Sequence, residues 1–290
     1  MGKFVDHITF LSALQQKVST IGQAVADTHG DWIVKGFIDI YRKIYTVSVD
    51  TKVISKVLEL LLFPELEQFA DEYQLSIQLA PQQNFYPDLT LTSGASGLRF
   101  ALDVKSTYRV NADTTSGMTL GAFTGYFRNR QSSKNILYPY DTYAGHFVLG
   151  VIYSKNAAID DERQTYTLGQ LASIPAVIRD FTFFAQPKYA IASDRPGSGN
   201  TKNIGSVTAI NALVHGQGPF AQLGEEVYDD YWQHYLTKDM ATAIESQRPY
   251  TNLRTYLTYK ERGLQALQAQ RQALVERDDG DEEDGIGGVA

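Results

Sequence analysis

The 290-residue sequence contains no cysteine, which excludes a disulfide framework, a cysteine-ligated zinc site and a thiol nucleophile. Its longest apolar run, residues 57–63, is too short to cross a bilayer and includes Glu59. The first seven residues contain no apolar signal core. We therefore expect a soluble intracellular protein, without a membrane partner. Hydrophobic residues make up 43 % of the chain, which is enough to form a core and excludes wholesale disorder.

The net charge of −7 is unevenly distributed. Residues 276–290 contain seven acidic side chains and one basic side chain, a net of −6, which leaves 25 basic and 26 acidic residues in the rest of the chain. The main part of the chain is therefore nearly neutral. Binding to nucleic acid is not excluded, but it requires local basic clusters rather than a global field.

Hydrophobic periodicity predicts an α/β fold. Apolar residues at steps of three and four indicate a helix over 11–29 that stops at Gly30, and β-branched and aromatic residues indicate strands within 32–49. Asp50 is a good N-cap for a helix that ends near Pro64, with a short continuation to about Tyr73. Further strands are expected over 75–155 and 180–215, and helices over 225–275. We expect one domain over 1–275 and a disordered acidic tail over 276–290.

Two alternating segments around the turn at Ser93–Gly97 indicate a β-hairpin. On its second strand, Asp103 and Lys105 share a face, because side chains alternate in direction along a strand. If Asp88 on the first strand pairs near Asp103, two carboxylates and an ammonium converge. Hard oxygen ligands of this kind suit Mg²⁺, and phosphodiester hydrolysis uses a metal ion together with a nearby cation. The alternative is that the aspartates are surface charges paired with Lys105.

Pro87-Asp88 followed by Asp103-Val104-Lys105 matches the PD-(D/E)xK nuclease pattern. Further blocks between about residues 50 and 235 closely resemble a type II restriction endonuclease of this superfamily. These blocks include residues 50–53, 82–84, 86–88, 103–107, 119–121, 134–136, 197–201 and 203–206. The resemblance implies a restriction-endonuclease-like mixed β-sheet core flanked by helices, with a catalytic core over about 50–235 and C-terminal helices over about 225–275.

The resemblance also implies roles for individual residues. Asp88 and Asp103 look like metal-binding carboxylates, Lys105 like the lysine at the scissile phosphate, and Glu59 like an additional acidic residue near the site. The loop Gln82, Gln83 and Asn84 resembles one that follows the minor groove. The loop from Gly197 resembles a recognition loop of the major groove. The candidate DNA-binding residues of that loop and beyond are Gly197, Ser198, Gly199, Asn200, Thr201, Lys202, Asn203 and Lys134.

The recognition loop also has suitable chemistry of its own. Its glycines allow the main chain to approach base edges, Asn200 can pair with adenine, and the methyl group of Thr201 can pack on thymine. A nucleotide-phosphate loop is the rival interpretation, but the G-x-x-x-x-G-K-[ST] spacing is missing. The resemblance suggests cleavage at the centre of GATATC to blunt ends that carry 5′-phosphates.

Partners follow from the same resemblance. A palindromic duplex presents its half-site twice and matches a two-fold homodimer, for which elements within about 20–50 resemble the dimerisation region. A type II restriction enzyme implies double-stranded DNA as substrate, Mg²⁺ as cofactor and a cognate DNA methyltransferase as functional partner. It also implies a location in the cytoplasm of a prokaryotic cell. Two alternatives stay open: a nuclease of the same superfamily that acts in repair or without sequence specificity, and a DNA-binding protein that does not cut.

Overall fold

The computed structural model describes residues 6–82, 84–156, 164–197 and 202–283, from residue 270 onward as backbone only. Its described elements are α1 (His7–Ile21), η1 (Gly22–Ala24), β1 (Gly36–Ile38), β2 (Lys43–Thr46), α2 (Thr51–Tyr73), β3 (Leu75–Leu79), β4 (Leu89–Ser93), β5 (Arg99–Tyr108), β6 (Thr119–Ala122), η2 (Gly125–Phe127), η3 (Tyr140–Thr142), β7 (Tyr143–Lys155), β8 (Thr165–Thr167), η4 (Leu168–Ser173), β9 (Ile178–Pro187), α3 (Lys188–Ile191), β10 (Ala192–Pro196), β11 (Asn203–Ser206), α4 (Ile210–His215), α5 (Glu225–His234), α6 (Lys238–Ala243) and α7 (Leu253–Glu283).

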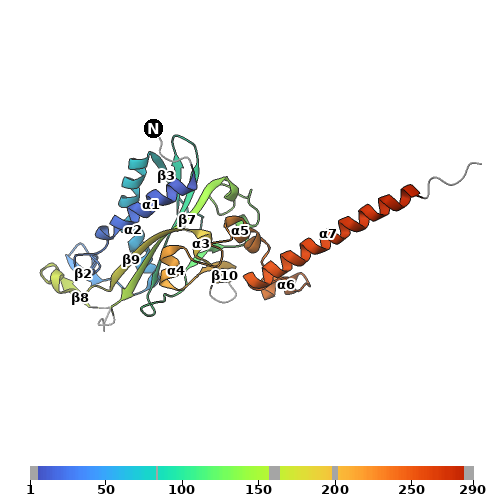
Figure 1. The fold of residues 1–290 in the computed structure, drawn as a ribbon. Helices are drawn as coiled ribbons and strands as arrows, with labels where there is room; N and C mark the ends of the chain where they lie inside the picture. The colour runs from blue at the N-terminus through green and yellow to red at the C-terminus, as the bar shows by residue number, and fades with distance from the viewer. Residues whose placement is uncertain (1–5, 83, 157–163, 198–201, 284–290) are drawn as a thin grey trace, which may run out of the picture. The chain divides into compact units, whose positions relative to one another are not determined.

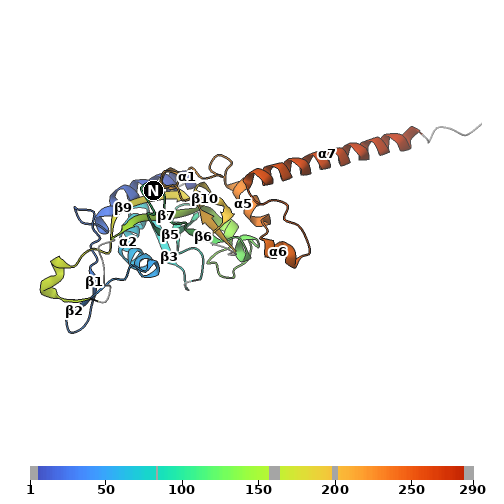
Figure 2. The same ribbon diagram turned by 90° about the horizontal axis from the view of Figure 1, so that it is seen from below.

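A mixed five-stranded sheet forms the centre of the fold, as the sequence predicts (Figure 1). Its strand order is β3-β4-β5-β7-β9, and only the β5–β7 pair is parallel. Two three-stranded sheets accompany it, β1-β2-β8 and β10-β11-β6 (Figure 2). The expected hairpin is the β4–β5 pair, in which Leu89 lies opposite Leu102.

The main core lies between α1, α2 and one face of the central sheet. Phe10 of α1 stacks on Phe100 of β5, with ring centroids 4.2 Å apart, and Leu58 of α2 belongs to the same buried cluster. Leu102 points into this cluster, so its neighbour Asp103 points to the opposite face of the sheet. The hydrophobic face therefore fixes the direction of the polar one.

Helix α1 is shorter than the predicted helix over 11–29. It ends at Ile21, and a short 3-10 helix follows. The carboxylate of Asp27 accepts hydrogen bonds from the backbone N–H groups of His29 (2.8 Å) and Asp31 (3.0 Å), which favours a turn over a continued helix. Val25 lies beyond the end of α1 but is still fully buried. The apolar pattern therefore marked buried residues correctly but not the end of the helix.

Helix α2 corrects a second expectation, because it continues through Pro64 to Tyr73 without a break. Its start is as predicted: the Asp50 carboxylate accepts hydrogen bonds from the N–H groups of Lys52 (2.8 Å) and Val53 (3.3 Å). Pro64 is exposed, whereas Leu62 and Leu66 are buried on the core face. The carbonyl that a proline leaves without its helical donor can therefore be hydrated, and burial of the opposite face maintains the helix.

The chain divides into two compact units, Met1–Gln233 and His234–Ala290. The single domain expected over 1–275 stays a prediction. The second unit contains α6 and α7. Helix α7 extends to Glu283 and so includes residues 276–283, which we expected to be disordered. Extending an existing helix costs less than starting one, and the Gln/Ala/Leu-rich segment before residue 276 favours such propagation. No helix within the described ranges is long and apolar enough to span a membrane.

Candidate nuclease active site

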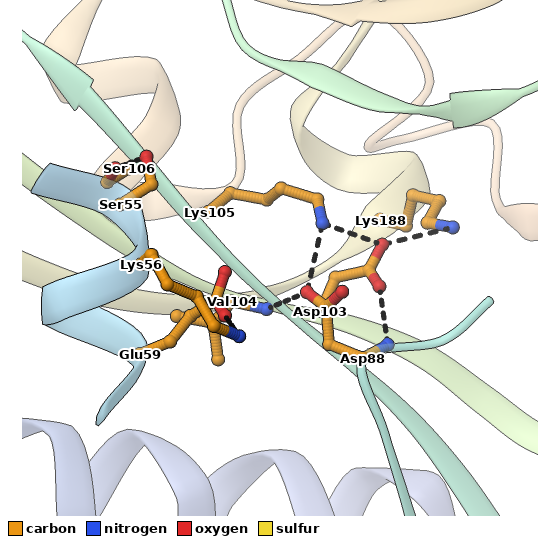
Figure 3. Close-up of polar contacts among 9 residues, drawn as sticks. All are labelled: Ser55, Lys56, Glu59, Asp88, Asp103, Val104, Lys105, Ser106 and Lys188. Carbon is orange, nitrogen blue, oxygen red and sulfur yellow. Dashed lines mark hydrogen bonds and ion pairs between the residues drawn. The ribbon is translucent and has the colours of Figure 1, made fainter. Parts of the chain in front are cut away.

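The polar face of the β4–β5 hairpin brings Asp88, Asp103 and Lys105 together, as the alternation of the two strands predicts (Figure 3). The Nζ atom of Lys105 lies 3.1 Å from Oδ2 of Asp88 and 3.5 Å from Oδ2 of Asp103. Backbone groups hold both carboxylates: the N–H of Val104 donates to Oδ2 of Asp88 (2.9 Å), and the N–H of Asp88 donates to Oδ1 of Asp103 (3.2 Å). Backbone N–H groups of the hairpin therefore position both carboxylates.

The carboxylates of Asp88 and Asp103 are like charges placed close together. Burial and then the charge of Asp103 raise the pKa of Asp88 above its ordinary value, and Lys105 only partly offsets this. Burial lowers the pKa of Lys105, but the Asp103 and Asp88 carboxylates outweigh it and raise that pKa, so Lys105 stays protonated at neutral pH. Asp103 is 3 % exposed. Two partly buried carboxylates that repel each other are a suitable donor set for a divalent cation.

Lys188, which the sequence motifs did not single out, completes this cluster. It is 3 % exposed, and its Nζ atom lies 3.9 Å from Oδ2 of Asp103. Burial lowers the pKa of Lys188 to about 8, although the charge of Asp103 opposes the change. The available signal was a lone lysine in the otherwise mainly apolar segment 183–191, where burial requires a partner of opposite charge.

Behind the lysine lies an aromatic and histidine layer. The Tyr86 hydroxyl lies 2.7 Å from Nδ1 of His146, and the His146 ring stacks on Tyr140 with centroids 3.9 Å apart. Burial, followed by the charges of Lys188 and Arg130, lowers the pKa of His146 well below its ordinary value. His146 is thus a neutral buried residue, in agreement with the packing role that its apolar sequence context predicts.

Glu59 is not brought into contact with the aspartate pair. It lies on α2, and its carboxylate pairs with Lys56 at 2.7 Å (Figure 3). Within the described ranges, no group of three or more His, Asp or Glu side chains could hold a metal ion. A role of Glu59 in catalysis stays a prediction.

The loop of residues 82–84 precedes Asp88 and β4 in the sequence. Gln82 and Asn84 are exposed, whereas Gln83 lies outside the described residues. Asn84 donates to the side-chain oxygen of Asn135 at 3.4 Å, so the loop adjoins the segment that carries the exposed Lys134. These candidate DNA contacts therefore share one neighbourhood.

The base of the predicted recognition loop is formed by β10 and β11, while Ser198, Gly199, Asn200 and Thr201 lie outside the described residues. The N–H of Gly197 donates to the carbonyl of Asn203 (2.9 Å), and the N–H of Phe123 donates to the carbonyl of Lys202 (3.0 Å). The second bond ties the loop to the end of β6. Gly121 on that strand is close to Lys188, because a Cβ there would lie 3.7 Å from its Nζ.

A mixed sheet whose central hairpin carries two carboxylates and a lysine is the architecture of a restriction endonuclease, an enzyme that hydrolyses DNA. Comparison with known proteins identifies the family. The model of the family described as restriction endonuclease EcoRV matches residues 28–261. The type II restriction enzyme EcoRV of Escherichia coli is 34 % identical over 247 residues, which cover 84 % of this chain and 98 % of that enzyme. The chain therefore belongs to the EcoRV restriction endonuclease family.

Among solved structures, the NlaIV restriction endonuclease is 10 % identical, with a TM-score of 0.39. That alignment covers 88 % of this chain and 96 % of the other. Restriction endonucleases generally use a divalent metal ion, commonly act as dimers, and act on DNA.

Proposed function

We propose that this protein is a Mg²⁺-dependent type II restriction endonuclease that cuts double-stranded DNA at the centre of GATATC and leaves blunt ends with 5′-phosphates. The observation that carries the proposal is the convergence of Asp88, Asp103 and Lys105 on one face of the β4–β5 hairpin. Within the proposal, the enzyme is cytoplasmic and works alongside a cognate DNA methyltransferase.

The donor chemistry of the site fits a magnesium ion. The carboxylates of Asp88 and Asp103 would hold it, because hard oxygen ligands suit Mg²⁺. A bound cation would also relieve the repulsion by Asp103 that, after burial, raises the pKa of Asp88. When bound, the ion would supply Lewis-acid polarisation of the phosphate and acidification of water.

Lys105 has a distinct role in the proposal. Its ammonium group stays protonated beside two carboxylates, so it acts as a fixed positive charge and hydrogen-bond donor. Such a group at the scissile phosphate stabilises the charge that develops on the phosphoryl oxygens during attack by water. Lys105 thereby favours the transition state over the ground state.

Sequence recognition is assigned to the segment Gly197–Thr201, with support from its resemblance to a family recognition loop and from the chemistry of Asn200 and Thr201. Lys202, which follows this segment in the chain, and Lys134, beside the loop of Asn84, are exposed and available for phosphates. Gln82, Gln83 and Asn84 are assigned to the backbone and minor-groove side. A bidentate contact to a base edge, such as the one proposed for Asn200, contributes about 1–3 kcal/mol of discrimination against a wrong base.

A two-fold dimer is supported by the small sheet β1-β2-β8. Large apolar side chains are exposed on and beside it: Phe37 (52 %), Ile38 (58 %), Ile40 (88 %), Tyr41 (84 %), Leu168 (45 %) and Leu171 (46 %). Such a concentration is typical of an interaction surface. Pairing of two copies would give each strand of a palindrome its own catalytic site.

The test is digestion of a plasmid of known sequence with Mg²⁺, with the fragment ends sequenced, for the wild type and the Asp103→Asn variant. We expect blunt cuts at GATATC that the variant loses. Discrete cuts at another sequence would overturn the proposed specificity, and a smear would instead indicate a nuclease without sequence specificity. Absence of cleavage at every Mg²⁺ concentration, with DNA binding retained, would indicate a protein that binds without cutting.

A further inference from the structure

Lys188 is a charged side chain placed where few charges are tolerated. It begins the short helix α3, directly after β9, and is 3 % exposed. Burying an ammonium group is costly unless a partner of opposite charge compensates for lost hydration. The groups around its Nζ atom therefore indicate which negative charge compensates for the burial of Lys188.

The head group of Lys188 has two close neighbours. Its Nζ atom lies 3.9 Å from Oδ2 of Asp103 and 3.8 Å from the centroid of the Tyr86 ring. Figure 3 shows that Lys105 and Lys188 reach the same carboxylate oxygen from different elements, β5 and α3. Gly121 of β6 lies beside this head group, since a Cβ there would lie at an ordinary contact distance of 3.7 Å from Nζ.

The two lysines have unequal positions. Lys105 contacts both carboxylates and has a side-chain exposure of 24 %, so it can face a substrate. Of the two carboxylates, Lys188 pairs with that of Asp103, and it has almost no exposed surface. In the ionised site, the two ammonium charges balance the two carboxylates before any cation arrives.

We propose that Lys188 is a positioning residue that fixes the Asp103 carboxylate and, as a positive charge behind it, weakens the binding of a divalent cation at the aspartate pair. The inference rests on the proposed metal site of Asp88 and Asp103. A unit charge a few ångströms away, screened by an effective dielectric constant of several tens, changes cation affinity about tenfold. Lys188 thus raises the metal concentration at which the enzyme works.

The experiment measures binding of Mn²⁺ alone to the full chain at pH 7, with free Mn²⁺ followed by electron paramagnetic resonance. We expect Lys188→Met, which keeps the length and removes the charge, to bind about tenfold more tightly than the wild type. Lys188→Arg should restore affinity to within about threefold of the wild type. If Lys188 had a purely structural role, both variants would bind Mn²⁺ more weakly than the wild type, or the Met and Arg variants would bind it equally well.

Lys155→Met is the matched control, because the Nζ atom of Lys155 lies 4.0 Å from the Tyr108 ring in a similar cation–π contact. It should leave Mn²⁺ affinity unchanged. Lys188→Gln repeats the charge removal with a polar side chain, and near-UV circular dichroism reports whether each variant keeps its fold. Unaltered or weaker binding in the folded Met or Gln variant would overturn the inference.

Asp103→Asn separates this inference from the proposed function. If Asp103→Asn abolishes Mn²⁺ binding while the charge-removing Lys188 variants leave it unaltered, the inference fails alone. If Asp103→Asn leaves Mn²⁺ binding intact, the metal site fails and the inference fails with it.

Discussion

At the scale of single residues, the site joins Asp88, Asp103 and Lys105 of one hairpin to Lys188 from a distant part of the chain. Asp88, Asp103 and Lys105 were predictable because side-chain alternation on two adjacent strands determines which residues share a face. Lys188 was not, because it lies 83 residues beyond Lys105 along the chain. Only the pairing of β5 with β7 and of β7 with β9 brings it close. Local patterns define a hairpin, but long-range strand pairing completes the site.

We predict that Lys105→Met lowers the single-turnover cleavage rate at least about 100-fold, since one preorganised charge at a transition state contributes about 3 kcal/mol or more. DNA affinity should change by less than about fivefold. Rapid-quench kinetics and gel-shift titration measure the two quantities. Lys105→Arg, which keeps the charge, should lose less activity; equal losses in both variants would show that charge is not what Lys105 contributes.

Glu225 predicts a dependence of stability on pH. Burial and the nearby charge of Asp229 raise its pKa from 4.5 to about 7. The folded state therefore binds more protons than the unfolded state between these values, and the free energy of unfolding falls as pH rises from about 4.5 to 7. Glu225→Gln should remove this loss and stabilise the protein by about 1–3 kcal/mol at pH 8, with little effect at pH 4.5.

Urea denaturation at pH 4.5 and pH 8 tests this prediction. The neighbouring Glu226 is exposed, and Glu226→Gln serves as a control that should leave stability within about 0.5 kcal/mol of the wild type at both values. Equal effects of Glu225→Gln at the two pH values would contradict the assigned pKa.

At the scale of elements, proline is a weaker terminator than its local chemistry suggests. The sequence identified the start of α2 correctly from Asp50 and a helical continuation to about Tyr73, but it placed a break near Pro64 where the helix is continuous. The error arose because local propensity ignores the buried face, where Leu62, Leu66 and Phe69 secure the helix against the sheet. Tertiary packing outweighed a missing hydrogen bond.

Pro64 lies within an otherwise continuous helix, so we predict that Pro64→Ala raises the free energy of unfolding by about 1–3 kcal/mol. Alanine restores the backbone donor and has a higher helix propensity. The midpoint of urea denaturation measures the change. Cleavage activity should stay at the wild-type level, since Pro64 is exposed. A fall in stability would mean that proline holds a bend that the fold requires.

The base of the recognition loop offers another prediction. A Cβ at Gly205 would lie 3.0 Å from Cα of Gly197, closer than ordinary packing allows. Gly205→Ala should therefore displace the strand ends that carry the loop and reduce cleavage of the cognate site about tenfold or more, with non-specific DNA binding retained. Gly117→Ala is the control, because its Cβ would meet only Thr208, at 4.0 Å. Equal cleavage by both variants would argue against a role for this close contact.

At the scale of the whole molecule, exposed apolar residues on and beside β1-β2-β8 predict self-association. Ile40→Asp places a charge at a position that is 88 % exposed in one chain and buried in the proposed dimer. We expect sedimentation velocity to shift from twice the chain mass of 32.3 kDa to a single copy. Ile8→Asp, at a position 65 % exposed on α1, should leave the dimer intact. A dimeric Ile40→Asp protein would place the interface elsewhere.

The position of β5 has a consequence for how the enzyme loses activity. This strand carries Asp103 and Lys105, and it is the middle strand of five, hydrogen-bonded to β4 on one side and β7 on the other. Backbone amides in such a strand exchange with solvent deuterium chiefly when the whole sheet opens, whereas amides at termini and loop tips exchange through local fluctuations. We therefore expect the proposed catalytic residues Asp103 and Lys105 to lie in the most slowly exchanging part of the central sheet. Gradual heating should then abolish cleavage at the same temperature at which this sheet melts.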